Sequence, residues 1–305
     1  MGKKTGPKYI GSLFGEMTNL AILSDIHGNL PALEAVLADL ADFDVDHVIV
    51  PGDVISFGPF SRQTAELVIE KGWSVIRGNN EFFLIDFKTP RAPAEWNDPI
   101  QFAPTVWLYR QFDHKLKTII GSWPDMLNLY FQDAPPILVC HGTPESPWDT
   151  LYATMTDQEI EKILGDVKAN YVICGHTHLP MDRQSGKWRI FNPGSVGVPL
   201  DGFFSASYMI LEGNEQGWKP TFRRVSFDYE AVFEEFERSG YNKESGPMGR
   251  LVVEVYKTAR PLFGFLRWRE KHKLDAPLTY ELVEEYLTNC NWWEYSHPAY
   301  HINME

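Results

Sequence analysis

The sequence predicts a layered α/β fold in which short buried strands alternate with helices. Five short apolar runs each end in a polar cluster, and segments with helix-like spacing of apolar residues separate the first of them. Short apolar runs suit strands that are covered on both faces. The order of strand, polar loop, helix and next strand is typical of α/β domains.

The five runs and the clusters that follow them are Leu20–Ser24 before DIHGN, His47–Val50 before PGD, Trp73–Ile76 before RGNNE, Ile137–Cys140 before HGTP, and Tyr171–Cys174 before GHTH. In α/β sheets, ligands bind at the loops that leave the carboxyl ends of the strands. All five clusters are at such positions, so we expect them to form one site.

Two helices are expected between the first strands, because Pro31 opens PALEAVLADLADF and Pro59 opens PFSRQTAELVIEKG. Proline suits the first turn of a helix. Residues 90–125 indicate an irregular-to-helical insertion, which we interpret as a cap over the site. The runs SASYMILE and FRRVSF predict further strands, and residues 229–239 predict a helix.

The chain divides into three parts on composition. Residues 1–16 are interpreted as a leader, which lacks the apolar core of ~7–15 residues that a secretory signal needs. Residues 17–240 form the main domain. The segment NKESGPMG is interpreted as a linker, and residues 241–305 are expected to form an aromatic-rich helical C-terminal extension. The tail NWWEYSHPAYHINME within it could be a lid, a dimer contact or an ordered wrap on the domain surface, and the sequence leaves these three open; a homo-oligomer would form through the extension.

Composition excludes several classes of protein. The 305 residues are 44% hydrophobic and contain no apolar run near the ~18–20 residues that a membrane span requires. A formal charge of −13 disfavours polymeric nucleic acid as a partner. A small phosphorylated substrate remains compatible, because buried divalent cations invert the local field. The three cysteines, Cys140, Cys174 and Cys290, make no disulfide framework and fit a cytoplasmic location.

The polar clusters carry oxygen and imidazole donors in a pattern that predicts a metal centre. Such donors converging at strand ends need a compensating partner, and a divalent metal is the natural one. Without thiolate, the set suits Mn, Fe, Zn, Co or Ni, with Mn favoured, better than Ca or Mg. Seven donors are too many for one tetrahedral zinc, but they serve two ions if one carboxylate bridges. The predicted ligands are Asp25, His27, Asp53, Asn79, His141, His176 and His178.

With these blocks, DIHGN (25–29), GD (52–53), GNN (78–80), HG (141–142) and GHTH (175–178), the sequence resembles the calcineurin-like metallophosphoesterases. NPGSVG (192–197) is typical of the bacterial phosphodiesterase-like branch. The resemblance runs from about Met17 to Ser239, and the five blocks together are highly specific. The final ~65 residues lie outside it.

The resemblance implies a four-layer α/β/β/α sandwich that hydrolyses small phosphate esters. Asp25, His27, Asp53 and His178 would hold one metal, and a bridging Asp53 with Asn79, His141 and His176 would hold the other. The two metals would lower the pKa of a bridging water and so supply hydroxide as the nucleophile. Asp53, Asn79, Asn80 and His141 are thereby assigned to catalysis, and Asn79, Asn80 and Arg77 to substrate binding.

Asn80 departs from the family pattern, which has a histidine at this position that contacts phosphate and protonates the leaving group. An amide donates hydrogen bonds but is no general acid near pH 7, and general acid catalysis contributes typically ~10²–10⁴-fold. The departure favours activated phosphodiesters, or leaving groups that are assisted by the metal or by another residue.

A second departure concerns Phe57. RGNNE is similar to a block of the Ser/Thr protein phosphatases, but their phosphate-gripping arginine would be at position 57. A protein phosphatase-like monoesterase is therefore disfavoured, and a metal-holding interaction scaffold is kept as the alternative of another class. For Arg77, a structural ion pair remains as open as substrate contact. His114 reads as part of a solvated helix face, while His297 and His301 are poor ligand candidates because the site is already filled.

Overall fold

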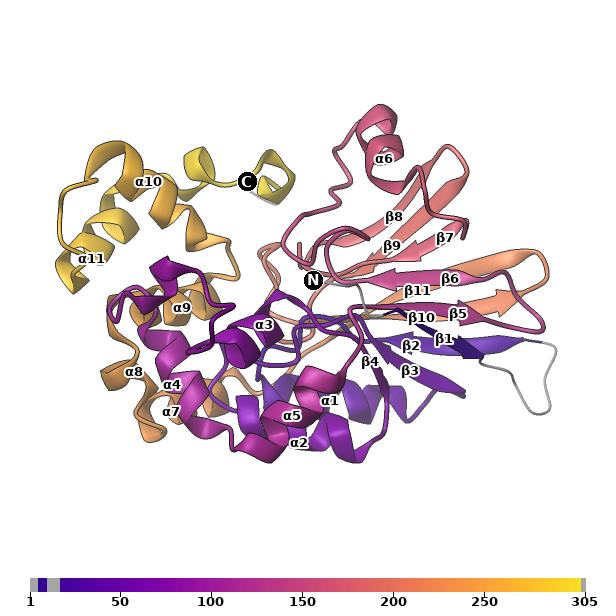
Figure 1. Ribbon diagram of the computed structural model, residues 1–305, viewed down its shortest axis with the longest axis horizontal. Coiled ribbons are helices and arrows are strands. Elements are labelled where there is room, and N and C mark those ends of the chain that lie inside the picture. Colours follow the sequence, from indigo (N-terminus) through magenta and orange to yellow (C-terminus); the bar gives the residue numbers. More distant parts are fainter. Residues whose placement is uncertain (1–4, 10–16, 303–305) are drawn as a thin grey trace.

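The computed structural model describes residues 5–9 and 17–302, and for residues 5–9 the backbone only (Figure 1). Residues 1–4 and 10–16 of the expected leader lie outside the described residues. Residues 5–9 form β1, which pairs in parallel with β5.

The described strands form two mixed sheets. The first has the order β1 (Thr5–Tyr9), β5 (Met126–Tyr130), β6 (Ile137–Cys140), β7 (Tyr171–Ile173), β9 (Trp188–Pro193) and β8 (Pro180–Ser185). The second has the order β11 (Gly217–Val225), β10 (Ala206–Asn214), β2 (Thr18–Ile22), β3 (His47–Val50) and β4 (Ser74–Val75). β2, β3 and β4 are parallel to one another, as are β6, β7 and β9, so the loops that follow each trio lie at one edge of its sheet.

The helices fall into an N-terminal, a central and a C-terminal set. They are α1 (Leu30–Leu40), α2 (Ser61–Glu70) and α3 (Asn79–Asp86); η1 (Ala94–Asn97), α4 (Ala103–Gln111), α5 (His114–Ser122) and α6 (Asp157–Leu164); and α7 (Tyr229–Arg238), α8 (Tyr241–Glu244), α9 (Gly246–Thr258), η2 (Leu262–Gly264), α10 (Phe265–His272), α11 (Tyr280–Asn289), η3 (Trp292–Tyr295) and η4 (Pro298–Tyr300).

Three apolar cores separate four layers, and they confirm the α/β/β/α sandwich. Side chains such as Ile22 and Phe191 fill the space between the two sheets. Helices α1, α2, α4, α5, α7 and α9 pack on the outer face of the second sheet. Ile160 and Leu164 of α6 cover the outer face of the first sheet (Figure 1).

Local sequence signals explain the elements that lead to the site. Asn29 caps α1 by accepting a hydrogen bond from the Ala32 N–H, and Pro31 follows in the first turn, as predicted. The runs predicted as strands at His47–Val50 and Ile137–Cys140 coincide with β3 and β6. The other three predicted runs differ from β2, β4 and β7 by one or two residues at their ends.

The segment NKESGPMG, expected as a linker, is helical instead and forms most of α8 and the start of α9. The reason is packing: Tyr241 is 1% exposed and lies against Trp107 and Phe236. Two helices of the insertion at 90–125, α4 and α5, likewise bury their apolar sides in the helical layer. No helix among the described residues is both long enough and apolar enough to span a bilayer.

Candidate metal centre

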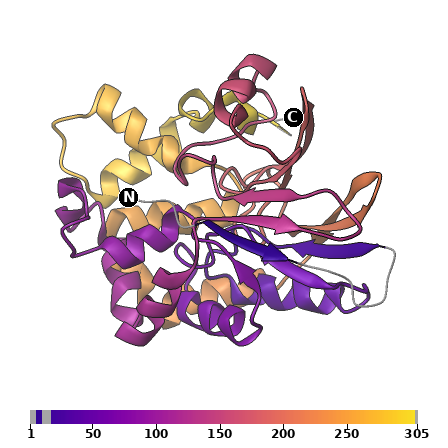
Figure 2. The ribbon, with the colours of Figure 1, turned by 45° about the vertical axis from the view of Figure 1, so that its right-hand side comes forward.

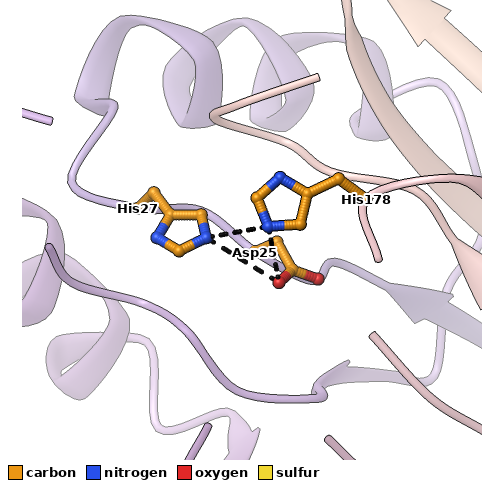
Figure 3. Close-up of side chains that lie close together, drawn as sticks. All are labelled: Asp25, His27 and His178. Carbon is orange, nitrogen blue, oxygen red and sulfur yellow. Dashed lines mark hydrogen bonds and ion pairs between the residues drawn. The ribbon is translucent and has the colours of Figure 1, made fainter. Parts of the chain in front are cut away.

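The first group of donor side chains is Asp25, His27 and His178, which point toward one another in Figure 3. The Nε2 atoms of His27 and His178 lie 3.0 Å apart. The Oδ1 atom of Asp25 lies 3.2 Å from His178 Nε2 and 3.8 Å from His27 Nε2. All three side chains are buried.

The second group is Asp53, His141 and His176, joined by Asn79. His141 Nε2 lies 3.0 Å from Asn79 Oδ1 and 3.3 Å from Asp53 Oδ2. Asp53 Oδ2 also lies 3.6 Å from Nε2 of His27 in the first group. The structure therefore brings all seven predicted donors together, with the Asp53 carboxylate between the two groups.

The loops hold these donors in an unusual backbone conformation. Asp25, His27, Asp53, His176 and His178 all have φ between 50° and 67°. Left-handed conformations are uncommon for residues other than glycine and cost on the order of 1–3 kcal/mol each. Backbone bonds between the loops maintain the geometry; for example, the His27 N–H donates to the Asp53 carbonyl at 2.9 Å. Such strain concentrates at functional sites.

Two imidazoles are oriented so that one ring nitrogen faces each donor group. His141 Nδ1 lies 2.7 Å from the Pro51 carbonyl, and His178 Nδ1 lies 2.5 Å from the Val198 carbonyl. Each Nδ1 therefore donates to a carbonyl, which turns Nε2 toward the carboxylates. In each group, lone pairs of nitrogen and oxygen converge in a buried space, an arrangement that a cation satisfies. The donor set, imidazole and oxygen without thiolate, fits a divalent transition metal.

The pKa values of the donor side chains show that the buried carboxylates of the site need positive charge. Burial alone would lower the pKa of His141, but the Asp53 and Asp25 carboxylates raise it to about 10. Burial likewise opposes ionisation of Asp53, yet His141 and His27 hold the pKa of that carboxyl well below its usual range. Burial lowers the pKa of His27 and of His176 to about 4, so both rings are neutral near pH 7. Neutral imidazole and ionised carboxylate are the forms that bind metal, so His27, His176 and Asp53 already have the binding form near pH 7, whereas His141 would release a proton on binding.

Glu81 supports the second group, although sequence reasoning assigned it no role. Its carboxylate accepts hydrogen bonds from the backbone N–H groups of Gly78, Asp53 and Val54 at 2.7–2.9 Å. It thus ties the loop after β3 to the start of α3. Glu81 belongs to the RGNNE block and directly follows Asn79 and Asn80. This position beside two predicted site residues was the signal that could have identified it.

The NPGSVG segment ties the other loops together. Asn192 Nδ2 donates to the Gly175 carbonyl at 2.7 Å, and Ser195 Oγ donates to the Asp25 carbonyl at 2.7 Å. Gly175 leaves no room for a side chain, because a Cβ there would lie 2.3 Å from Ser24 Oγ. These contacts lock the Asp25 loop against the loop that carries His176 and His178.

Three other predicted residues take different positions. Asn80 lies beside the donors, and its Nδ2 donates to Asp53 Oδ2 at 2.7 Å. Arg77 is 7% exposed, and its Nε donates to Asp125 at 2.8 Å, so the structure places it in an ion pair away from the donors. His114 is exposed at the start of α5 and does not approach the centre.

A cavity of about 250 Å³ lies over the two groups. His27, Asp53, Asn79, Asn80, His176 and His178 form one side of it. Residues of the C-terminal extension line it as well, among them Phe263, Arg267, His297 and Tyr300. Sequence reasoning left a lid open for the tail but assigned none of these four residues to the site; the concentration of aromatic residues in the tail was the signal of a packed segment.

Comparison with known proteins adds a family. The family model of the calcineurin-like phosphoesterase superfamily domain matches residues 18–216. An uncharacterised protein of Methanocaldococcus jannaschii is 24% identical over 237 residues, which cover 72% of this chain and 92% of that protein. Phosphodiesterase YfcE of Escherichia coli is 26% identical over 211 residues, covering 65% and 89%. The solved structure of a metallophosphoesterase from Sphaerobacter thermophilus has a TM-score of 0.61 and 25% identity, covering 80% and 99%.

Proposed function

Because the chain belongs to the calcineurin-like phosphoesterase superfamily and is a metal-dependent phosphoric ester hydrolase, we propose that it hydrolyses small phosphodiesters at a dinuclear centre. The observation that carries the proposal is the pair of donor groups joined by Asp53. A single ion would leave half of these buried donors without a partner. Two ions match the number and arrangement of the donors.

The chain's own residues would divide between the ions as follows. Asp25, His27 and His178 would hold one ion, and Asn79, His141 and His176 the other, with Asp53 shared. When bound, such ions polarise phosphoryl oxygens and lower the pKa of water, which supplies a nucleophile near neutral pH. Manganese is the ion we favour among Mn, Fe, Zn, Co and Ni, all of which suit these donors.

Asn80 orients the shared carboxylate. Its backbone N–H donates to Asp53 Oδ1 at 2.9 Å and its side-chain amide to Oδ2 at 2.7 Å. Both oxygens of Asp53 are thereby directed, which fixes how the carboxylate faces the two donor groups. An amide so engaged protonates no leaving group. This supports a preference for diesters whose leaving group departs without an acid.

The name of the similar Escherichia coli protein, phosphodiesterase YfcE, is consistent with a diester substrate. A cytoplasmic location is the one we propose, supported by three cysteines that form no disulfide among the described residues. A contact between copies of the chain would involve the C-terminal extension, and light scattering would reveal it.

The function is tested by loading the protein with Mn²⁺, Co²⁺ or Ni²⁺ after chelation. We expect two ions per chain and hydrolysis of bis-nitrophenyl phosphate, with slower hydrolysis of the mono-nitrophenyl ester. The chelated protein should lose activity and regain it on reloading. Absence of hydrolysis of both esters with every metal, at full metal occupancy, would favour the scaffold alternative.

Replacing Asn80 by histidine tests the leaving-group argument. Histidine supplies a general acid where the amide has none, and such catalysis is worth about 10²–10⁴-fold when geometry is ideal. We expect the ratio of monoesterase to diesterase activity to rise about tenfold or more. The measurement is kcat/KM for both nitrophenyl esters in parent and Asn80→His; an unchanged ratio removes the argument.

A further inference from the structure

The C-terminal segment forms part of the wall of the cavity that the donor groups also line. In Figures 1 and 2 the yellow part of the chain runs from α10 and α11 back toward the sheet of β7 and β9. Phe263, Arg267, His297 and Tyr300 line the same cavity as His27 and Asp53. The family match ends at residue 216, and these four residues lie beyond it, in the C-terminal extension.

Two ring contacts hold the segment in place. Phe263 packs on Phe57 with ring centroids 5.1 Å apart, and Phe57 in turn packs on the ligand candidate His27 at 4.7 Å. His297 stacks on Tyr152 with centroids 3.8 Å apart and an angle of 4° between the planes. Aromatic pairs of this kind contribute about 0.5–1.5 kcal/mol beyond their buried area. These two contacts therefore hold the segment against the rest of the domain at two places on the cavity wall.

Arg267 is the cation that this segment brings to the cavity. Among the described residues that line it, Arg267 is the one lysine or arginine. Within residues 17–302, no hydrogen bond or ion pair engages its guanidinium. Its charge reaches the cavity wall: burial raises the pKa of Tyr300 well above its ordinary value, and Arg267 acts against that rise. Arg77, by contrast, is held by Asp125.

We propose that Arg267 binds the phosphoryl group of the substrate, so that the C-terminal extension completes the phosphate site over the two donor groups. The inference rests on the proposed function. A guanidinium presents a fork of N–H donors that matches two phosphate oxygens, which suits it to this task better than an ammonium. The substrate is then held between the donor groups below and Arg267 above.

The cavity also limits the substrate class. Its volume of about 250 Å³ is smaller than the ~300–1,000 Å³ typical of pockets for drug-sized ligands. The site therefore takes a compact phosphate ester with one phosphoryl group in the cavity.

The test is binding of inorganic phosphate to the metal-loaded full-length chain, measured by titration calorimetry. Arg267→Gln should weaken phosphate about tenfold, the lower end of the range for a charge-assisted hydrogen bond, because the side chain is partly solvated. Arg267→Lys should recover part of the loss. Metal content, measured on the same samples, should stay at the parent value.

Lys271→Gln is the matched control, since it removes one positive charge from the same helix at a residue that does not line the cavity. It should bind phosphate as the parent does. Equal affinity of parent and Arg267→Gln overturns the inference, and so does an equal loss in Lys271→Gln. If the parent binds phosphate but hydrolyses neither ester, the proposed function fails while the binding comparison still decides the role of Arg267.

Discussion

Replacing Asp53 by asparagine is expected to lower phosphodiester hydrolysis at least about a thousandfold and to reduce the metal content below two ions per chain. Asp53 lies within 3.3 Å of His141 Nε2 and 3.6 Å of His27 Nε2, so its carboxylate serves both donor groups. An amide offers one weaker oxygen and no charge. Losing the several kcal/mol that a metal pair contributes to the transition state gives a factor of this size.

The matched control is Asp42→Asn, which makes the same chemical change at an exposed residue beyond α1. It should leave both metal content and hydrolysis unchanged. Metal content is measured by atomic emission after dialysis, and hydrolysis with bis-nitrophenyl phosphate. If Asp53→Asn retained two ions and the parent rate, the shared role of this carboxylate would be wrong.

Replacing Leu251 by alanine is expected to lower the free energy of unfolding by about 2–5 kcal/mol, as for other fully buried leucines. Leu251 belongs to α9 and is 0% exposed in the core beneath the second sheet. The measurement is urea unfolding of the metal-free chain, followed by circular dichroism. Lys257→Ala, at an exposed position of the same helix, should change the value by no more than about 0.5 kcal/mol.

The same packing predicts that a chain ending at Gly240 does not fold. It would lack α9, with the buried side chains of Leu251, Val252, Val253, Val255 and Tyr256. Each contributes about 1.5–3 kcal/mol, and their sum rivals the roughly 5–15 kcal/mol that stabilises a whole domain. A cooperative unfolding transition in the truncated chain would contradict this.

Much of the site followed from the sequence, because its donors come directly after strands. Asp25 and Asp53 follow β2 and β3 of the second sheet, and His141 and His176 follow β6 and β7 of the first, so each pair lies at one edge of its own sheet. Local order along the chain therefore placed each pair, and the packing of the two sheets against each other brings the pairs together. The four-layer fold was implied by the family resemblance and is confirmed by the three apolar cores.

Contacts between distant parts of the chain were decided by the tertiary structure alone. Arg77 pairs with Asp125, which stands 48 positions later. Because of this ion pair, Arg77 is not the cation that we propose for the phosphoryl group. The choice for the tail at 291–305 among lid, dimer contact and surface wrap was equally beyond the sequence. A periodic pattern in the sequence answers neither question, because each depends on which side chains meet after the two sheets have formed.

The identity of the seven donors and their positions at strand ends are thus what the sequence by itself determined, and the stacking of the two sheets joins them into two groups. Only the tertiary structure could show that α9 belongs to the core and that Phe263 and His297 seat the extension over the cavity. The physical reason is that a contact between two aromatic rings leaves no signal in the local sequence. Phe57 and Tyr152 pack against Phe263 and His297, which lie far from them along the chain and meet them only in the folded protein. The same packing brings Arg267 to the cavity that the metal-ligand candidates line.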